Sequence, residues 1–220
     1  MTERLGKYIV IEGHDGTGKS TQVTRIRERL AGRGIDSIEI SEPAKDPKDG
    51  PEEVLIASEI RTMIKNGSLQ RDAVTNLLLF SAAARELWVQ KAKPALALGK
   101  YAVAARSDIS RKAYQGYGEG LDLGLIDTIT AIATDQKYMN PDIAVILDLD
   151  DEEERQRRID ARGPLENPDT FESKDDDFQT RVRDGYVDIA RKRGIPVVSA
   201  AKPIPEVTDD IWAIIEPHLP

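Results

Sequence analysis

Residues 7–20 read KYIVIEGHDGTGKS, and this stretch decides the fold. Its first part, KYIVIE, is short, apolar and rich in β-branched residues, which predicts a buried strand. The part that follows, from Gly13 to Ser20, matches the pattern G-x-x-x-x-G-K-[ST]. A helical pattern then runs from Ser20 to Arg33 and ends before Gly34. A strand, a glycine-rich loop and a helix in this order are the context that the pattern requires.

The loop is typical of sites that bind nucleotide phosphates. Glycines let the main chain wrap closely, so that amide N–H groups point at phosphate oxygens, and the following helix adds its positive end. We expect Lys19 to reach the β- and γ-phosphates of ATP and the Ser20 hydroxyl to bind Mg²⁺. The predicted ATP-binding residues of the loop are Gly13, His14, Asp15, Gly16, Thr17, Gly18, Lys19, Ser20 and Thr21. The bland alternative is a glycine-rich turn with an ordinary lysine. The loop alone leaves three activities open: a small-molecule kinase, an ATPase and a nucleotide-binding switch.

Working outward, short apolar runs alternate with longer helical patterns along the whole chain. Further strands are predicted at residues 36–41, 101–105, 142–149 and 195–200. Helices are predicted at residues 51–65, 70–98, 121–137 and 204–216, and helical spacing recurs between 178 and 189. Such alternation predicts an α/β fold: a five-stranded parallel sheet flanked by helices, as in P-loop kinases, formed by residues 1–220 as a single domain.

Composition excludes several classes of function. The 220 residues include no cysteine and only two histidines, which rules out disulfides, thiolate zinc sites and cysteine nucleophiles. The net charge of −8 argues against a broad nucleic-acid-binding face. No apolar run is long enough for a signal peptide or a membrane span, so we expect a soluble, cytoplasmic protein without nucleic-acid or membrane partners.

Motifs beyond the loop resemble those of thymidylate kinase, the nucleoside-monophosphate kinase family that makes dTDP from dTMP and ATP. They follow one another in family order across nearly the whole chain. They are IEGHDGTGKSTQ (11–22), Glu42-Pro43 with Glu59-Ile60-Arg61, LLLFSAAAR (77–85), KPAL (93–96) leading to RSDIS (106–110) and AYQG (113–116), Pro141-Asp142 with Leu147-Asp148, and RVR (181–183) with Tyr186.

The resemblance implies roles for individual residues. Asp15 would bind the 3′-hydroxyl of the deoxyribose, Phe80 would stack on thymine, and Arg106 would hold the acceptor phosphate. Tyr114 would lie against the sugar edge and disfavour a 2′-hydroxyl. The implied dTMP-binding set is Asp15, Glu42, Arg61, Phe80, Arg85, Arg106, Ser110, Arg111, Tyr114 and Gln115, and the implied catalytic set is Lys19, Arg106, Asp15 and Arg158. From the residues alone, Phe80 and Tyr114 could equally be core, Asp15 a turn residue and Arg106 one half of an ion pair.

Two positions depart from the family pattern. The family usually has Asp-Arg after the third strand, and here the pair is Ala105-Arg106. The family arginine that reads the base falls at Ala84, with Arg85 next to it. Arg85 or Arg111 could take over the contact to the base carbonyl; otherwise the base preference has changed. A related kinase with another acceptor and a catalytically weak nucleotide-binding protein therefore remain as alternatives.

Residues from about 151 to 177 form the predicted lid. Arg155, Arg158 and Arg162 share one helix face, and the resemblance implies that they bind ATP, because the family branch with glycine at position 16 has its arginines in the lid. The alternative is a solvated helix with i, i+4 ion pairs. The segment GPLENPDTFESKDDD (163–177) is either part of this lid or a plain loop. The resemblance also implies a homodimer.

Overall fold

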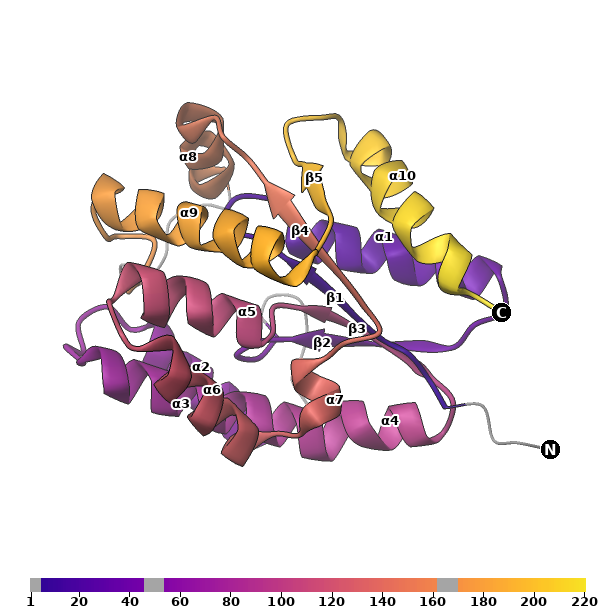
Figure 1. Ribbon diagram of the computed structural model, residues 1–220, viewed down its shortest axis with the longest axis horizontal. Helices are drawn as coiled ribbons and strands as arrows, with labels where there is room; N and C mark the ends of the chain where they lie inside the picture. The colour runs from indigo at the N-terminus through magenta and orange to yellow at the C-terminus, as the bar shows by residue number, and fades with distance from the viewer. Residues whose placement is uncertain (1–4, 46–53, 162–169) are drawn as a thin grey trace.

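A sheet of five parallel strands forms the centre of the molecule in the computed structural model, which describes residues 5–45, 54–161 and 170–220 (Figure 1). The strand order is β2-β3-β1-β4-β5. The strands are β1 (Tyr8–Glu12), β2 (Ser37–Ser41), β3 (Tyr101–Ala105), β4 (Ile143–Asp148) and β5 (Val197–Ser199). The predicted fold class is thus confirmed, with each strand inside the range expected from its apolar run.

Helices cover both faces of this sheet (Figure 1). The α-helices are α1 (Lys19–Gly32), α2 (Leu55–Lys65), α3 (Ala73–Leu87), α4 (Lys93–Ala97), α5 (Asp108–Arg111), α6 (Leu123–Ala133), α7 (Gln136–Met139), α8 (Glu152–Asp160), α9 (Asp176–Arg193) and α10 (Ile204–Ile215). Two π-helical segments, η2 (Trp88–Ala92) and η3 (Lys112–Gly118), continue α3 and α5, and a short 3₁₀ turn, η4 (Glu216–His218), follows α10. None of the helices in the described ranges is long and apolar enough to cross a membrane.

The side chains of β1 point alternately to the two faces of the sheet, so they pack into two separate apolar layers. Ile9 and Ile11 face α1 and α10, where they pack with the buried apolar residues of those helices. Tyr8 and Val10 face the opposite way, toward α3, η2 and α4. Successive strand residues point to opposite faces, so a strand buried on both sides must be mainly apolar, as residues 8–11 are.

The carboxyl ends of the strands share one edge of the sheet. Ile11 of β1 and Ser41 of β2 both lie opposite Ala105 of β3, and Glu12 lies opposite Ile146 of β4. The residues that leave these strands, Gly13 and Arg106 among them, are therefore neighbours in space. Open parallel sheets bind ligands at this edge.

Several predicted boundaries differ from the structure. The helix expected at 70–98 is three consecutive segments, because a π-helical turn at Trp88–Ala92 interrupts it before Lys93-Pro94. The helix expected at 121–137 ends at Ala133, and Asp135 caps a separate short helix, α7. Residues 108–118 are helical, which the sequence did not predict. Asp176 and Asp177, assigned to the loop or lid segment, form the first turn of α9, with Asp175 as the N-cap.

Candidate active site

The glycine-rich loop connects β1 to α1 at the carboxyl edge of the sheet. Gly13 has a φ of 139°, and a Cβ there would lie 2.4 Å from the carbonyl oxygen of Leu147, so only glycine fits between the loop and β4. Gly16 has a φ of 89° and lies against the side chain of Arg155. Gly18, also in the left-handed region, leads directly into α1. The loop thus has the close-wrapped form that the sequence motif predicts.

Lys19 bridges the loop from inside. Its Nζ donates to the carbonyl oxygen of His14 at 2.8 Å, and the Thr17 hydroxyl donates to the same oxygen at 2.8 Å. The side chain is buried although it carries a charge. Burial and the neighbouring Lys19 ammonium lower the pKa of His14 to about 4, so its imidazole is neutral at pH 7. Ser20 and Thr21, in the first turn of α1, are both exposed.

Asp15 and Arg106 face each other across this edge. The Nη2 of Arg106 donates to Oδ1 of Asp15 at 2.5 Å, and the Tyr114 hydroxyl donates to Oδ2 of Asp15 at 2.7 Å. The Arg106 guanidinium also lies over the Tyr114 ring, 5.1 Å from its centroid. The charge of Arg106 holds the pKa of the Asp15 carboxyl well below its usual range, against the opposing effect of burial. The structure therefore brings together three residues that the sequence assigned to one substrate.

The main chain at Arg106 has an unusual conformation. Its φ is 79°, and it is the one non-glycine residue with a positive φ among the described residues. Such a conformation costs about 1–3 kcal/mol and persists only where surrounding contacts fix it. Here Arg106 Nη1 donates to the hydroxyls of Ser110 at 3.1 Å and Tyr186 at 3.3 Å. The guanidinium is thus fixed in direction before any ligand arrives.

A fully buried carboxylate, Glu12, lies beneath Arg106. It accepts hydrogen bonds from the Ser107 hydroxyl (2.8 Å), the Ser110 hydroxyl (2.7 Å) and the Ser110 amide (3.2 Å). Ala105, where the family has aspartate, is packed into the apolar core. Asp148 forms a two-bond ion pair with Arg183, at 2.9 Å for each bond. Glu12 is therefore the carboxylate that supports the arginine loop here, through Ser110.

Arg111 is buried in a cluster with Glu42 and Tyr138. Its Nη1 donates to Glu42 Oε2 at 3.0 Å and its Nη2 to the Tyr138 hydroxyl at 2.8 Å, while Tyr138 donates to Glu42 Oε1 at 2.5 Å. Arg111 is 2% exposed. Burial raises the pKa of Glu42 to about 7, although the Arg111 charge opposes the rise. Glu42 and Arg111, both expected at the acceptor nucleotide, thus bond to each other and to Tyr138.

Two other predicted arginines reach main-chain oxygens. Arg85 is exposed on α3, and its Nη1 donates to the Ala133 carbonyl at 3.0 Å, at the end of α6. Arg61 on α2 donates to the carbonyl of Ala44, at 3.3 Å, just beyond Glu42-Pro43. Ala84 is fully buried against the sheet. The structure thus does not bring Arg85 to the other predicted residues, whereas Arg61 lies close to them.

Aromatic rings form one wall beside Asp15 and Arg106. Phe80, partly buried on α3, lies 5.7 Å from Phe171 between ring centroids, and Phe171 lies 5.7 Å from Tyr114. Phe178 completes the group, 6.2 Å from Phe171. Sequence reasoning missed Phe171. The available signal was a phenylalanine within the otherwise polar segment 163–177.

The arginines of α8 make local ion pairs. Arg155 is 2% exposed; it pairs with Glu152 and packs against Gly16 of the loop. Arg158 bonds to Glu154 at 2.7 Å and to the Ala200 carbonyl at 3.0 Å. Arg157 pairs with Glu154. Arg162 lies outside the described residues.

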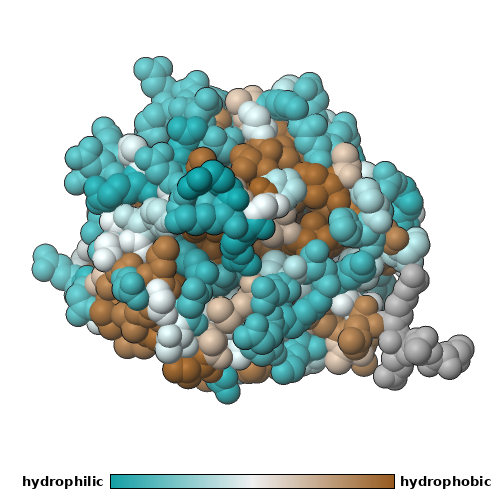
Figure 2. Space-filling view, viewed as in Figure 1, coloured by the Kyte–Doolittle hydropathy of each residue, from teal (hydrophilic) through white to brown (hydrophobic). Residues whose placement is uncertain are grey.

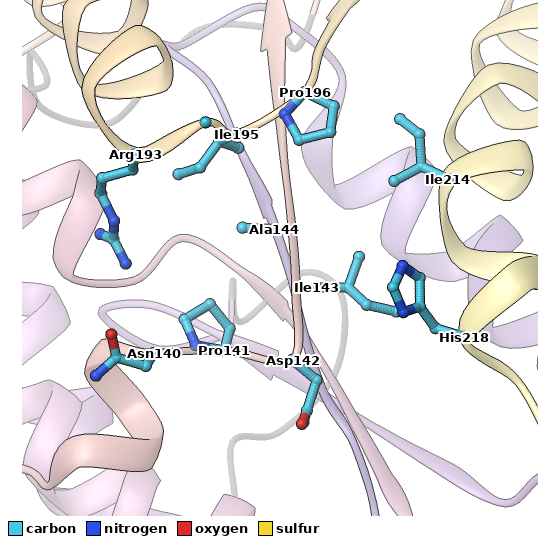
Figure 3. Close-up of a pocket in the computed structure, with 11 residues that line it drawn as sticks. Asn140, Pro141, Asp142, Ile143, Ala144, Arg193, Ile195, Pro196, Ile214 and His218 are labelled. Atoms are coloured by element: carbon cyan, nitrogen blue, oxygen red, sulfur yellow. The ribbon is translucent and has the colours of Figure 1, made fainter.

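A separate cavity of about 340 Å³ opens at the opposite edge of the sheet (Figure 3). It lies between the start of β4 and the segment that leads into β5, with Asn140, Ile195 and His218 in its lining. Arg193, which also lines it, bonds to Asp108 Oδ2 and to the Met139 carbonyl. None of the residues that the sequence assigned to the nucleotides lines this cavity.

Comparisons with known proteins agree on one family. The family model described as thymidylate kinase matches residues 11–211. Thymidylate kinase of Pelodictyon phaeoclathratiforme is 35% identical over 219 residues, covering 96% of each chain, and that of Colwellia psychrerythraea is 36% identical over 209 residues, covering 94% of this chain and 92% of the relative. The crystal structure of thymidylate kinase from Ehrlichia chaffeensis superimposes with a TM-score of 0.74 at 28% identity, covering 96% of this chain and 98% of that chain.

Proposed function

This chain belongs to the thymidylate kinase family of ATP-dependent phosphotransferases, and from that membership we propose which of its residues bind and transfer the phosphoryl group. The reaction moves the γ-phosphoryl group of ATP to the phosphate of dTMP, which gives dTDP and ADP. The observation that carries the residue assignment is the meeting of the glycine-rich loop with the Asp15–Arg106–Tyr114 cluster at one edge of the sheet.

The loop from Gly13 to Thr21 binds ATP. Its main-chain amides and the start of α1 face the phosphates, and Lys19, already held inside the loop by His14, moves its ammonium onto the β- and γ-phosphates. Arg155 and Arg158 lie on α8 next to this loop and to Ala200. Of the lid predicted at about 151–177, residues 162–169 lie outside the described residues. Helix α8 forms the first part of this lid, and Arg158 adds charge at the transferred group when the lid closes.

The residues of this site fit a Mg²⁺ ion that binds together with ATP. The described residues contain no group of three or more His, Asp or Glu side chains that could hold a metal ion. The exposed Ser20 hydroxyl can supply one protein ligand, and Mg²⁺ ordinarily completes its shell with substrate phosphates and waters. When bound, the ion neutralises charge on the phosphates.

The acceptor dTMP lies on the Arg106 side. Its phosphate takes the place of the Asp15 carboxylate at the Arg106 guanidinium, and the freed Asp15 accepts a hydrogen bond from the 3′-hydroxyl. Phe80 stacks on thymine, and the Tyr114 ring fills the space next to the sugar. Arg61 and Ser110 support the phosphate end, Glu42 and Arg111 hold the strand ends beneath it, and Gln115 contacts the base. The acceptor is already an anion, so the reaction needs positioned cations rather than a strong base.

Apolar side chains on α2, α3 and α6 support the proposal of a homodimer. Hydrophobic surface gathers over this part of the molecule at the lower left of Figure 2, in the region where Figure 1 shows these helices. The exposed apolar residues of these three helices include Leu55, Ile56, Met63, Val74, Leu78 and Ile132. Exposed apolar area of this kind marks protein–protein interfaces. We also expect the enzyme to act in the cytoplasm.

A panel of nucleotides tests the assignment. Purified protein is incubated with ATP, Mg²⁺ and dTMP, dUMP, dCMP, dGMP or dAMP, and ADP release is followed by a coupled assay. We expect the largest kcat/KM with dTMP. Faster turnover of another monophosphate would contradict the thymine assignment, and no turnover of any would contradict the assignment of the catalytic residues.

A further inference from the structure

A chain of hydrogen-bonded polar side chains runs from the end of α2 to Gln115, the residue that follows Tyr114, and the roles above use only Gln115. It consists of Arg71, Asn76, Glu119 and Gln115. Asn76 and Gln115 are each 1% exposed. Asn76 precedes Phe80 by one helical turn on α3, so the two lie on the same face of that helix. Gln115 is next to Tyr114 in η3. The chain of side chains therefore ends at the residue next to Tyr114, and the proposed function places the Gln115 amide at the base.

Arg71 fixes one end of this chain. Its guanidinium nitrogens donate to the carbonyl oxygens of Met63 (2.9 Å), Ile64 (2.8 Å) and Leu69 (3.0 Å), at and just beyond the end of α2. It also donates to the Thr170 hydroxyl at 2.9 Å. Its remaining nitrogen, Nε, donates to Oδ1 of Asn76 at 3.0 Å. Arginine has no acceptor atom, so the atom of Asn76 that faces it must be the oxygen.

Each hydrogen bond in this chain of side chains then determines which atom the next side chain must present. With its oxygen toward Arg71, Asn76 must present its NH₂ group to Glu119, and Nδ2 donates to Oε1 at 2.8 Å. Glu119, as a carboxylate, only accepts, so Gln115 must also offer it an NH₂ group, and Nε2 donates to Oε2 at 3.2 Å. The main chain of Glu119 is held as well, because its amide donates to the Tyr114 carbonyl at 2.8 Å. The network thus determines which end of the Gln115 amide is nitrogen, an assignment that packing alone would leave open.

We propose that Arg71, Asn76 and Glu119 are positioning residues that lock the Gln115 amide so that its oxygen is the atom left to meet the acceptor base. This inference rests on the proposed function, in which dTMP is the acceptor. The pairing edge of thymine carries one donor, N3–H, between two carbonyl oxygens. An oxygen held toward that edge matches N3–H, whereas the N3 of cytosine is an acceptor and would leave two acceptors facing each other. The lock therefore favours thymine and uracil over cytosine.

Kinetics of the Glu119→Gln variant test the lock. A glutamine at 119 has the same size but can donate to the Gln115 oxygen, which lets the Gln115 amide turn its NH₂ group toward the base. We expect the ratio of kcat/KM for dTMP over dCMP to fall about tenfold, through KM, with kcat for dTMP within about twofold of the wild type. Glu28→Gln, which changes an exposed carboxylate on α1, is the matched control and should leave the ratio unchanged.

A second background shows whether Glu119 acts through Gln115. In Gln115→Ala protein, adding Glu119→Gln should change the ratio no further, whereas a general structural effect would appear equally in both backgrounds and would overturn the proposal. An unchanged ratio in folded Glu119→Gln protein would also overturn it. If wild-type protein does not phosphorylate dTMP, the proposed function is wrong. If wild-type protein phosphorylates dTMP but the Glu119→Gln variant keeps the wild-type ratio, only the positioning role of Glu119 is wrong.

A measurement on wild-type protein covers the case in which Glu119→Gln does not fold. With ¹⁵N-labelled glutamine, the Gln115 side-chain NH₂ signal is identified by its absence in Gln115→Ala protein. If the NH₂ group is bound to Glu119, its signal should change little when dTMP is added. A large change that shows the NH₂ group in contact with the base would contradict the inference.

Discussion

At the scale of single residues, Lys19 is the clearest case of a cationic side chain that is already positioned inside the loop before ATP binds. Its ammonium is buried inside the loop and bonded to the His14 carbonyl, a contact that a phosphate can replace. We expect Lys19→Ala to lower kcat about 100-fold or more, because phosphoryl transfer depends on cations at the transferred group. ADP release under saturating ATP and dTMP measures this effect. Calorimetric titration with dTMP should show unchanged acceptor binding; a variant that retains wild-type kcat would contradict the role.

Arg106 tests whether shape matters as well as charge. Its guanidinium donates at once to Asp15, Ser110 and Tyr186, which a lysine ammonium cannot reproduce with the same geometry. For Arg106→Lys we expect kcat/KM for dTMP to fall about 10- to 100-fold, while KM for ATP changes little. Steady-state kinetics with each substrate varied in turn separate the two effects. An equal rise in both KM values would instead indicate a distorted loop.

His14 makes the free energy of unfolding depend on pH, because its pKa is lower in the folded protein than in the unfolded chain. Its pKa falls from 6.5 to about 4 in the folded state, so the unfolded chain binds the proton more readily between these values. Stability from His14 is therefore complete above about pH 6.5 and is lost as the pH falls toward 4, by up to about 3 kcal/mol. Urea unfolding at several pH values, compared with His14→Gln protein, measures this. A constant difference between the two proteins from pH 7 to pH 4 would contradict it.

Residue spacing predicted some of these contacts and could not predict others. The pattern Gly13–Ser20 specifies its own local geometry, and the loop has the wrapped form expected of it, with Lys19 bonded to the His14 carbonyl inside it. The buried ion pair of Arg111 could not be predicted, because its partners, Glu42 and Tyr138, are distant in sequence and meet it only through the fold. The composition around Arg111 carries no sign of a buried ion pair.

At the scale of elements, the turn between β1 and α1 depends on the absence of one side chain. A Cβ at Gly13 would lie 2.4 Å from the Leu147 carbonyl oxygen, which belongs to the backbone of β4 and cannot move freely. Gly34, at the end of α1, also has a positive φ but has open space around it. We expect Gly13→Ala to lower the free energy of unfolding by more than 2 kcal/mol, and Gly34→Ala by only about 1 kcal/mol. Chemical denaturation of both variants measures the difference; equal losses would show that backbone strain alone matters.

The three central strands, β1, β3 and β4, were predictable because each is a short, mainly apolar run that is almost entirely buried. Tyr101–Ala105 and Ile143–Asp148 follow that rule, and their predicted ranges contain the observed ones. Residues 108–118 were missed because η3 has one extra residue per turn and carries Gly116 and Gly118, which disrupts the spacing used to recognise a helix. The predicted lid was open to two interpretations because the sequence does not show what Phe171 packs against.

At the scale of the whole molecule, one fact about the sheet explains why the site lies where it does. Parallel strands bring all their carboxyl ends to one edge, so the loops after β1, β2 and β3 meet although they are far apart in sequence. The order β2-β3-β1-β4-β5 puts the glycine-rich loop at the centre of that edge, between the Arg106 segment and β4. The alternation of strands and helices predicted the sheet but left the strand order undetermined.

The proposed homodimer is the remaining property at this scale, and it can be tested by placing a charged side chain in the exposed apolar area. Leu78 on α3 is 52% exposed within the apolar area of α2, α3 and α6, whereas Leu98 is 77% exposed at the end of α4. A twofold interface through α3 would bury Leu78 from both chains, so Leu78→Glu would introduce two unpaired charges and weaken the dimer at least 100-fold. We expect sedimentation velocity at about 10 µM to show a wild-type dimer, a Leu78→Glu monomer and a Leu98→Glu dimer, because the Kd of a stable dimer lies well below this concentration. If the wild type sediments as a monomer, or if Leu78→Glu and Leu98→Glu behave alike, then the apolar area of α3 does not hold two chains together.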